Sequence, residues 1–513
     1  MLLFVNGTIH TMDPLNPHPE ALLAHNGRIL DLGSLRHIQE KHPGATLVDM
    51  KGKTLLPGFN DSHLHLLGIG MRLNQIDLSS VESIEALKEK LLRHQGDGDI
   101  LVGYGWNQEH FKEGRMPSSH DLDATGILKP IIIHRTCVHM LVANTLAMEK
   151  AGVFEPSGLF KESGMNPLKD LVPPPDEKAL AGYILSAAKV LLSHGVTSVQ
   201  SDDLFMVDTS LHQLVFDVYE TLERENRLPL RVYEQTNFKQ YEDYLKNIPD
   251  YRQDRTSDRR FKRGPVKILG DGSLGGRTAR LKEPYSDDTG TRGLLNFSPE
   301  AVRHLFQLCD EHQLDVAVHA IGDEMLQIAL EALEPLKHAA CRHSIIHCQV
   351  TDTETLAALD RLKPVLHIQP GFLNGDIHMA PSRLGPKRLR TAYNYKTLEN
   401  LDLVIAFGTD APVESTNPFL GIYHAVTRKD LKGFPQDGWL PGQTLSLYDA
   451  IKHYTVDGAY ASYDENKKGA LKAGYYADFI LVDRDPFTVA KDDLKDLRVL
   501  ETFVGGQSVY PLD

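Results

Sequence analysis

Short runs of alternating apolar and polar residues occupy the first 56 positions of the chain. These runs cover residues 2–10, 21–32 and 46–56, and the last two are interrupted at Asn26-Gly27 and Lys51-Gly52. Such alternation predicts half-buried strands, and Asn-Gly between apolar runs is typical of a tight hairpin turn. We therefore expect a small β module at the N-terminus.

The C-terminal part of the chain has the same pattern. Apolar runs cover residues 469–471, 477–483 and 499–506, separated by polar turns. Neither end supplies enough strands to bury a core by itself. We therefore expect residues 1–56 and 466–513 to pair into one discontinuous β-sandwich domain.

Helical and strand patterns alternate through most of the middle of the chain, residues 57–465. Eight alternating strands and helices predict a (β/α)8, or TIM, barrel of the α/β class. The expected strands are the one that ends at His63-Leu64-His65 and residues 196–200, 230–235, 266–270, 315–320, 343–349, 364–369 and 403–409.

Residues 71–175 interrupt this alternation. A helical pattern over 83–93 and strands at 99–104 and 130–134 do not continue the barrel, and the stretch ends at Pro173-Pro174-Pro175. A proline cluster before a capped helix start marks a boundary. We interpret residues 71–175 as a subdomain inserted after the first barrel strand.

Composition narrows the class of protein. The net charge is −14, from 55 basic and 69 acidic residues, and no long basic run occurs, which argues against nucleic acid or an anionic membrane as a partner. The four cysteines form no C-x-x-C pair, so neither a disulfide framework nor a structural zinc site is indicated. No apolar run reaches bilayer length and the N-terminus lacks a signal-peptide pattern, so we expect a cytoplasmic protein.

The first barrel strand ends in two imidazoles, His63 and His65. In a strand, residues two positions apart point to the same side, which is a geometry that metal ligands use. The pair alone is ambiguous, because a chain with 24 histidines contains such spacings by chance. The predicted barrel allows the metal-site interpretation to be tested, because further ligands should then lie at the ends of other strands.

Other expected strands supply such residues. Lys267 lies in the fourth strand, His319 and His347 end the fifth and sixth, and Asp410 follows the eighth. An unpaired buried charge costs several kcal/mol, so these groups need a common partner. Neutral imidazole and carboxylate bind Zn, Fe, Mn, Co or Ni.

Lys267 is the exception in this set, because an ammonium group repels a cation. Carboxylated by CO2 it becomes an anionic carbamate, which can bridge two metals about 3.5 to 4 Å apart. If it is not carboxylated, it must pair with a carboxylate such as Asp271 or Asp410.

These motifs carry a family resemblance. They are residues 57–65, Lys267 with 271–278, 319–323, His347, 408–413 and the tail 474–486, which together extend over nearly the whole chain. The chain resembles the amidohydrolase superfamily, and within it the amidohydrolase-3 group of YtcJ-like and N-substituted formamide deformylase-like proteins. The resemblance implies a distorted barrel, a β-sandwich from both termini, an inserted subdomain over the active site, and hydrolysis of a C–N bond by metal-activated hydroxide.

The resemblance also implies roles for individual residues. Asp410 would be the catalytic residue that moves a proton from water to the leaving nitrogen, and Lys267 a carboxylated bridge. The cofactor would be a divalent metal, with zinc the first candidate, at about one or two ions per chain. The implied ligands are His63, His65, Lys267, His319, His347 and Asp410.

Five further residues are candidates for contact with a small-molecule substrate: Trp106, His139, Arg277, Asp271 and His367. For Trp106 a role as a core anchor is an equally open interpretation. For Arg277 the alternative is a loop salt bridge, but its position after the fourth strand favours contact with an anionic substrate or intermediate. His343 lies four residues before His347 on the same strand face, so it is an alternative ligand.

Three functions remain open from the sequence. The first is hydrolysis of an amide, formamide, cyclic amide or N-acyl bond, and the second is phosphoester or ester hydrolysis by the same metal centre. The third is a catalytically silent barrel with a binding or regulatory role, although such a barrel normally loses ligands. An exposed sandwich edge would also be compatible with a homodimer.

Overall fold

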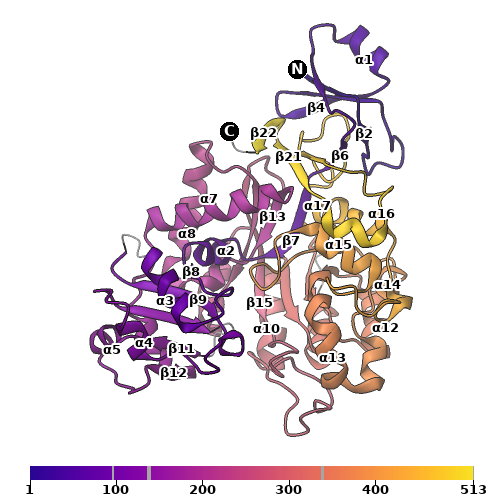
Figure 1. The fold of residues 1–513 in the computed structure, drawn as a ribbon. Coiled ribbons are helices and arrows are strands. Elements are labelled where there is room, and N and C mark those ends of the chain that lie inside the picture. The colour runs from indigo at the N-terminus through magenta and orange to yellow at the C-terminus, as the bar shows by residue number, and fades with distance from the viewer. Residues whose placement is uncertain (95–97, 136–139, 337–339, 512–513) are drawn as a thin grey trace. The chain divides into compact units, whose positions relative to one another are not determined.

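The computed structural model describes residues 1–94, 98–135, 140–336 and 340–511 (Figure 1). The chain forms two compact units. One consists of Met1–Leu66 together with Ala188–Asp513, and the other consists of Leu67–Ala187.

The first unit contains a parallel eight-stranded sheet that curves into a barrel, which confirms the predicted fold class. The sheet order is β19-β18-β17-β16-β15-β14-β13-β7. Backbone bonds join its two edges, since Asp410 N donates to His63 O and His65 N donates to Ala411 O, each at 2.8 Å. The strands are β7 (Phe59–Leu64), β13 (Val196–Ser201), β14 (Arg231–Asn237), β15 (Phe261–Leu269), β16 (Val316–Ala320), β17 (Ser344–His347), β18 (Val365–Ile368) and β19 (Ile405–Phe407).

Helices follow most of these strands, and Figure 1 shows α10, α12, α13 and α15 on the outside of the barrel. In α10, Ser298 caps the first turn and Pro299 occupies its start, where a missing N–H costs nothing. The helices are α7 (Glu177–Ser193), α8 (His212–Arg224), α9 (Tyr241–Asn247), α10 (Pro299–Glu311), α11 (Asp323–Leu333), α12 (Thr353–Leu362), α13 (Leu373–Arg388), α14 (Tyr395–Glu399), α15 (Pro418–Thr427), α16 (Leu447–His453) and α17 (Val456–Ala461).

Both chain termini contribute to the sandwich, as expected. Its first sheet has the order β4-β3-β1-β5 and its second the order β2-β6-β20-β21-β22, so strands from opposite ends of the chain pair in one sheet. Phe4, Phe479 and Phe503 pack between them with ring centroids 4.7 to 5.2 Å apart. The strands are β1 (Leu2–Val5), β2 (Thr8–Ile9), β3 (Ala21–His25), β4 (Arg28–Gly33), β5 (Thr46–Asp49), β6 (Thr54–Pro57), β20 (Phe479–Val482), β21 (Val499–Val504) and β22 (Gln507–Tyr510).

The unit formed by Leu67–Ala187 has its own sheet, with the order β12-β11-β10-β9-β8. Ile131 and Ile133 of β10 belong to one apolar cluster and Ile132 to another, so both faces of this sheet are covered. Its elements include β8 (Ile76–Asp77), α3 (Ile84–Arg93), β9 (Leu101–Trp106), α4 (Ser119–Asp123), β10 (Ile131–Arg135), β11 (Met140–Ala143), α5 (Thr145–Ala151) and β12 (Leu159–Lys161).

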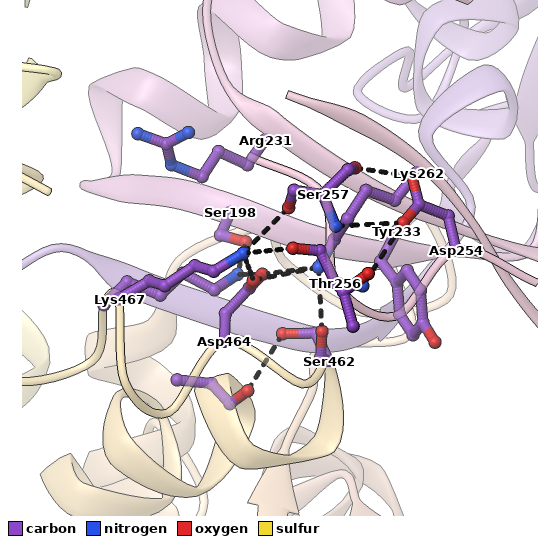
Figure 2. A network of polar contacts seen from close by, with 12 residues as sticks. Ser198, Arg231, Tyr233, Asp254, Thr256, Ser257, Lys262, Ser462, Asp464 and Lys467 are labelled. Carbon is purple, nitrogen blue, oxygen red and sulfur yellow. Dashed lines mark hydrogen bonds and ion pairs between the residues drawn. The ribbon is translucent and has the colours of Figure 1, made fainter. Parts of the chain in front are cut away.

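At the amino ends of the barrel strands, a buried polar network holds the segment that leads back to the sandwich (Figure 2). Lys262 Nζ donates to both carboxylate oxygens of Asp464 at 2.9 Å and to Ser462 O at 3.0 Å. Lys468 pairs with the same carboxylate at 3.5 Å and donates to Ser198 Oγ. Three donors on Lys262 therefore have three acceptors, and this network has a structural role.

Across the described residues, no helix combines the length and the apolar character that crossing a bilayer requires.

Candidate metal centre

Strand β7 and the loop after β19 bring two imidazoles and a carboxylate together. Asp410 Oδ1 lies 3.4 Å from His63 Nε2 and 3.2 Å from His65 Nε2. One ligand atom from each of these three residues falls within 4.8 Å of the others. His63 and Asp410 are buried, so their polar atoms need a partner other than bulk water.

The other predicted ligands adjoin this group. Lys267 Nζ lies 3.4 Å from His63 Nε2, and the His63 and His347 ring centroids are 5.7 Å apart. His319 packs edge-on against His347 with a centroid distance of 4.4 Å. The structure therefore gathers all six predicted ligands into one cluster at the carboxyl end of the barrel.

Three of the imidazoles have Nδ1 beside an oxygen acceptor. With its proton on Nδ1, His65 donates to Asp202 O at 2.9 Å, His319 to Asp271 Oδ1 at 2.9 Å and His347 to Gln369 Oε1 at 2.7 Å. This arrangement leaves the Nε2 lone pair available on each ring. Metal-binding histidines typically have such a partner, so these residues fit a divalent metal.

Electrostatics favour the neutral, metal-binding form of two imidazoles, His63 and His347. Burial, and then the neighbouring Lys267, hold the pKa of His63 well below its ordinary value, while burial and His319 do the same for His347. Neutral imidazole is the form that binds a metal. Burial alone would lower the pKa of His65, but Asp410 raises it to about 9, so this carboxylate is placed to stabilise positive charge.

The backbone is in an unfavourable conformation at three residues of this region, two of which are candidate ligands. His347 and Cys348 have φ values of 78° and 48°, and Asp410 has a φ of 57°, in the left-handed region that glycine favours. Such residues cost on the order of 1 to 3 kcal/mol each and cluster at functional sites. The bond from Asp410 N to His63 O holds one of them in place.

Asp61, which the sequence did not single out, supports this arrangement. It accepts hydrogen bonds from Thr409 N at 3.0 Å, Thr409 Oγ1 at 2.6 Å and His63 N at 3.2 Å. Burial raises the pKa of Asp61 to about 7. Asp61 thus ties the first barrel strand to the loop that carries Asp410.

The buried lysine has a different partner from those the sequence indicated. Lys267 Nζ lies 3.3 Å from Asp202 Oδ2, whereas Asp271 and Asp410 were expected. Asp271 is engaged elsewhere, because it accepts from His319 and from the backbone N–H groups of Ile321 and Gly322. Asp202 follows β13, a strand for which the sequence suggested no chemical residue.

Three of the residues that were expected to contact substrate make other contacts in the structure. Trp106 is 0% exposed in the core of the Leu67–Ala187 unit and donates to Ile133 O at 3.0 Å, so it occupies the core-anchor position. Arg277 makes the loop salt bridge, with Nε and Nη2 each 3.1 Å from Asp287. Asp271 orients His319.

Three further histidines were singled out as candidates from the sequence. His367 is buried in β18, and burial followed by Lys267 lowers its pKa to about 3. His343 precedes β17 and its Nδ1 accepts from Val316 N at 3.1 Å, away from the imidazole cluster. His139 lies outside the described residues.

Two aromatic side chains border the imidazoles. Phe372 stacks on His347 with a centroid distance of 5.6 Å, and Phe205 lies 6.5 Å from His65. Phe205 is 37% exposed, so part of its ring is available to a ligand. Neither residue could be identified from the sequence, because neither belongs to a chemical motif.

Comparison with known proteins identifies the family of the chain. Residues 46–510 match the model of the Amidohydrolase family. The chain belongs to the amidohydrolase family. Its eight-stranded barrel with imidazoles and a carboxylate at the carboxyl end is therefore that of a metal-dependent hydrolase.

Individual relatives extend over the full chain. YtcJ of Bacillus subtilis is 32% identical, with 98% of each chain aligned. The N-substituted formamide deformylase of Arthrobacter pascens is 22% identical over 99% of this chain and 98% of that one. The crystal structure of a metal-dependent hydrolase from Pyrococcus horikoshii is 32% identical with a TM-score of 0.81, covering 96% of this chain and 99% of that one.

Proposed function

We propose that this amidohydrolase-family chain hydrolyses a C–N bond other than a peptide bond in a small amide, formamide, cyclic amide or N-acyl compound. The observation that carries the proposal is the convergence of His63, His65 and Asp410 within 4.8 Å. The full-length similarity to an N-substituted formamide deformylase supports this bond class.

The cluster offers ligands for about one or two divalent ions, with zinc the first candidate. His63, His65 and Asp410 would hold one ion, and His319 and His347 would hold a second, with carboxylated Lys267 between them. A bound divalent ion would lower the pKa of water and polarise the scissile carbonyl.

Asp410 would do the proton chemistry. An amide nitrogen is a poor leaving group until it is protonated, so a base that takes the proton of the attacking water must return it to nitrogen. Asp410 is the one carboxylate within 3.5 Å of both His63 Nε2 and His65 Nε2 among the described residues. Phe372 and Phe205 would contact the apolar part of a substrate.

A substrate screen on zinc-loaded and metal-stripped enzyme tests this proposal. We expect turnover of N-formyl, N-acyl or cyclic amide compounds only with the loaded enzyme. Turnover confined to phosphoesters or carboxylic esters would contradict the proposed bond class. A loaded enzyme that hydrolyses none of these compounds would favour a silent binding barrel.

A further inference from the structure

Asp202 contacts two candidate ligands through different atoms. Its side-chain Oδ2 lies 3.3 Å from Lys267 Nζ, and its main-chain oxygen accepts from His65 Nδ1 at 2.9 Å. Asp202 is only 2% exposed, and its Oδ1 has no hydrogen-bond partner among the described residues. A desolvated carboxylate with one oxygen still free is costly unless its position serves a purpose.

Neighbouring residues fix Asp202 and Lys267 relative to each other. Asn237 Nδ2 donates to Asp202 Oδ2 at 3.3 Å, and Asn237 is directly paired with Lys267 in the β14–β15 ladder. The buried Tyr244 hydroxyl lies 2.6 Å from Lys267 O and 3.2 Å from Asn237 Oδ1. Lys267 is thereby held at its main chain by Tyr244 and at its amine by Asp202.

We propose that Asp202 is the positioning residue that directs carboxylation of Lys267 towards the imidazole cluster. The inference rests on the proposed function, because a carbamate matters only where it bridges metals. Asp202 does not touch substrate and acts through Lys267 and His65.

The chemistry explains why an acceptor is needed at this position. The Nζ lone pair of the free amine forms an N–C bond to CO2, one C=O electron pair moves onto oxygen, and one proton leaves to the solvent buffer. The carbamate nitrogen is planar and keeps one N–H, which must find an acceptor in a buried site.

Among the described residues, Lys267 Nζ has two acceptors within 3.5 Å, namely Asp202 Oδ2 and His63 Nε2. The lone pair of His63 is committed when this imidazole binds a metal. Asp202 then remains as the acceptor for the N–H, and the new carboxylate group lies on a different side of the planar nitrogen.

Carbamate can be measured directly by carbon-13 NMR of the metal-loaded protein equilibrated with carbon-13 bicarbonate, alongside metal analysis. In Asp202→Ala we expect carbamate occupancy to fall by about tenfold or more, and bound metal to fall from about two ions per chain to about one. Asp202→Asn should give an intermediate occupancy, because its amide oxygen can still accept the N–H.

Glu234→Gln provides a matched control. Glu234 is a fully buried carboxylate on the next barrel strand, and its Oε1 accepts from Asp203 N at 2.8 Å. We expect the carbamate signal and metal content of Glu234→Gln to equal those of the wild type. This control distinguishes loss of the Asp202 contact with Lys267 from loss of a buried charge in general.

A wild-type carbamate signal in both Asp202 variants would overturn the inference. It would also be overturned if the wild type binds metal and turns over substrate without any carbamate, since Asp202 would then simply pair with a Lys267 ammonium. A wild-type protein that binds no metal and hydrolyses nothing would instead overturn the proposed function. The near-isosteric Asp202→Asn keeps the test decisive if Asp202→Ala does not fold.

Discussion

The two ends of the barrel differ in how their buried charged side chains are paired. At the amino ends of the strands, the Lys262 ammonium meets three oxygens of Asp464 and Ser462 at 2.9 to 3.0 Å. At the carboxyl ends, buried atoms without a hydrogen-bond partner among the described residues include His63 Nδ1, Asp202 Oδ1 and His367 Nδ1.

The difference shows how a structural charge is told from a functional one. A paired buried charge stabilises one arrangement of the chain, and its partners are all protein atoms. An unpaired buried polar atom costs about 1 to 3 kcal/mol, so several beside a cluster of imidazoles and a carboxylate favour a ligand-binding role for that cluster. We therefore propose that the carboxyl end binds metal and substrate, whereas the amino end holds the barrel to its C-terminal segment.

Removing the proposed proton shuttle should have the largest effect at the carboxyl end. We expect Asp410→Asn to lower kcat by about 10⁴-fold while the fold is retained, because the amide cannot act as a base. Steady-state kinetics and circular dichroism would check this. Unchanged turnover at equal metal content would remove Asp410 from the mechanism.

Breaking the amino-end pair should instead affect stability. Lys262→Met leaves the Asp464 carboxylate buried without its main partner, so the free energy of unfolding should fall by about 3 to 5 kcal/mol. Chemical denaturation would measure this loss, and kcat per folded molecule should not change. The double variant Lys262→Met/Asp464→Leu should recover most of the stability. A fall in kcat per folded molecule in Lys262→Met would contradict the assignment of a purely structural role to the amino end.

A smaller effect is expected from the carboxylate that orients His319. Asp271→Asn should weaken metal binding by about 10- to 100-fold, because the imidazole loses a charged acceptor for its Nδ1 proton. Competition with a chelator would measure the change. Arg277→Gln, in the same loop but paired with Asp287, is the matched control and should bind metal as the wild type does. Equal losses in both variants would mean that the loop, and not the Asp271 contact, determines affinity.

The smallest effect concerns a half-buried carboxylate near the carboxyl end that has only neutral partners. Burial raises the pKa of Asp376 from 3.8 to about 6, although Tyr393 OH and Gln349 Nε2 donate to it. The folded state therefore binds more protons between these values, and the resulting stability is lost as pH rises through 6. Between about pH 5 and 7.5 the wild type should lose about 1 kcal/mol relative to Asp376→Asn. Parallel thermal unfolding curves at both pH values would contradict this.

Most of the fold could be predicted from the sequence because its signals are local. Apolar runs and helical periodicity predicted all eight barrel strands. The similar alternation of apolar and polar residues at both termini predicted the shared sandwich. The long helix α13 was missed because Pro381, Gly385 and Pro386 lie within it, and Gly385 has a φ of 69° at a kink. Proline and glycine usually end helices, so their presence within α13 argued against a helix in this stretch of the sequence.

The candidate site could be predicted only in part, because some of its contacts join residues that lie far apart in the sequence. Strand ends indicated His63, His319 and Asp410, since parallel strands present their carboxyl ends to one place. Asp202 reaches Lys267 from two strands away, β13 against β15, and nothing local in the sequence specifies such a contact. The role of Asp271 depends in the same way on where the loop after β15 folds back onto His319.

The central claim is that the imidazoles and the Asp410 carboxylate gathered at the carboxyl end form a divalent metal site. Metal analysis of protein supplied with zinc and bicarbonate, then freed of loosely bound ions, tests it most directly. We predict about one or two ions per chain in the wild type and in Lys262→Met, and a loss of at least one in His63→Ala/His65→Ala. A wild type that retains no metal, or a double variant that retains as much as the wild type, would contradict the account.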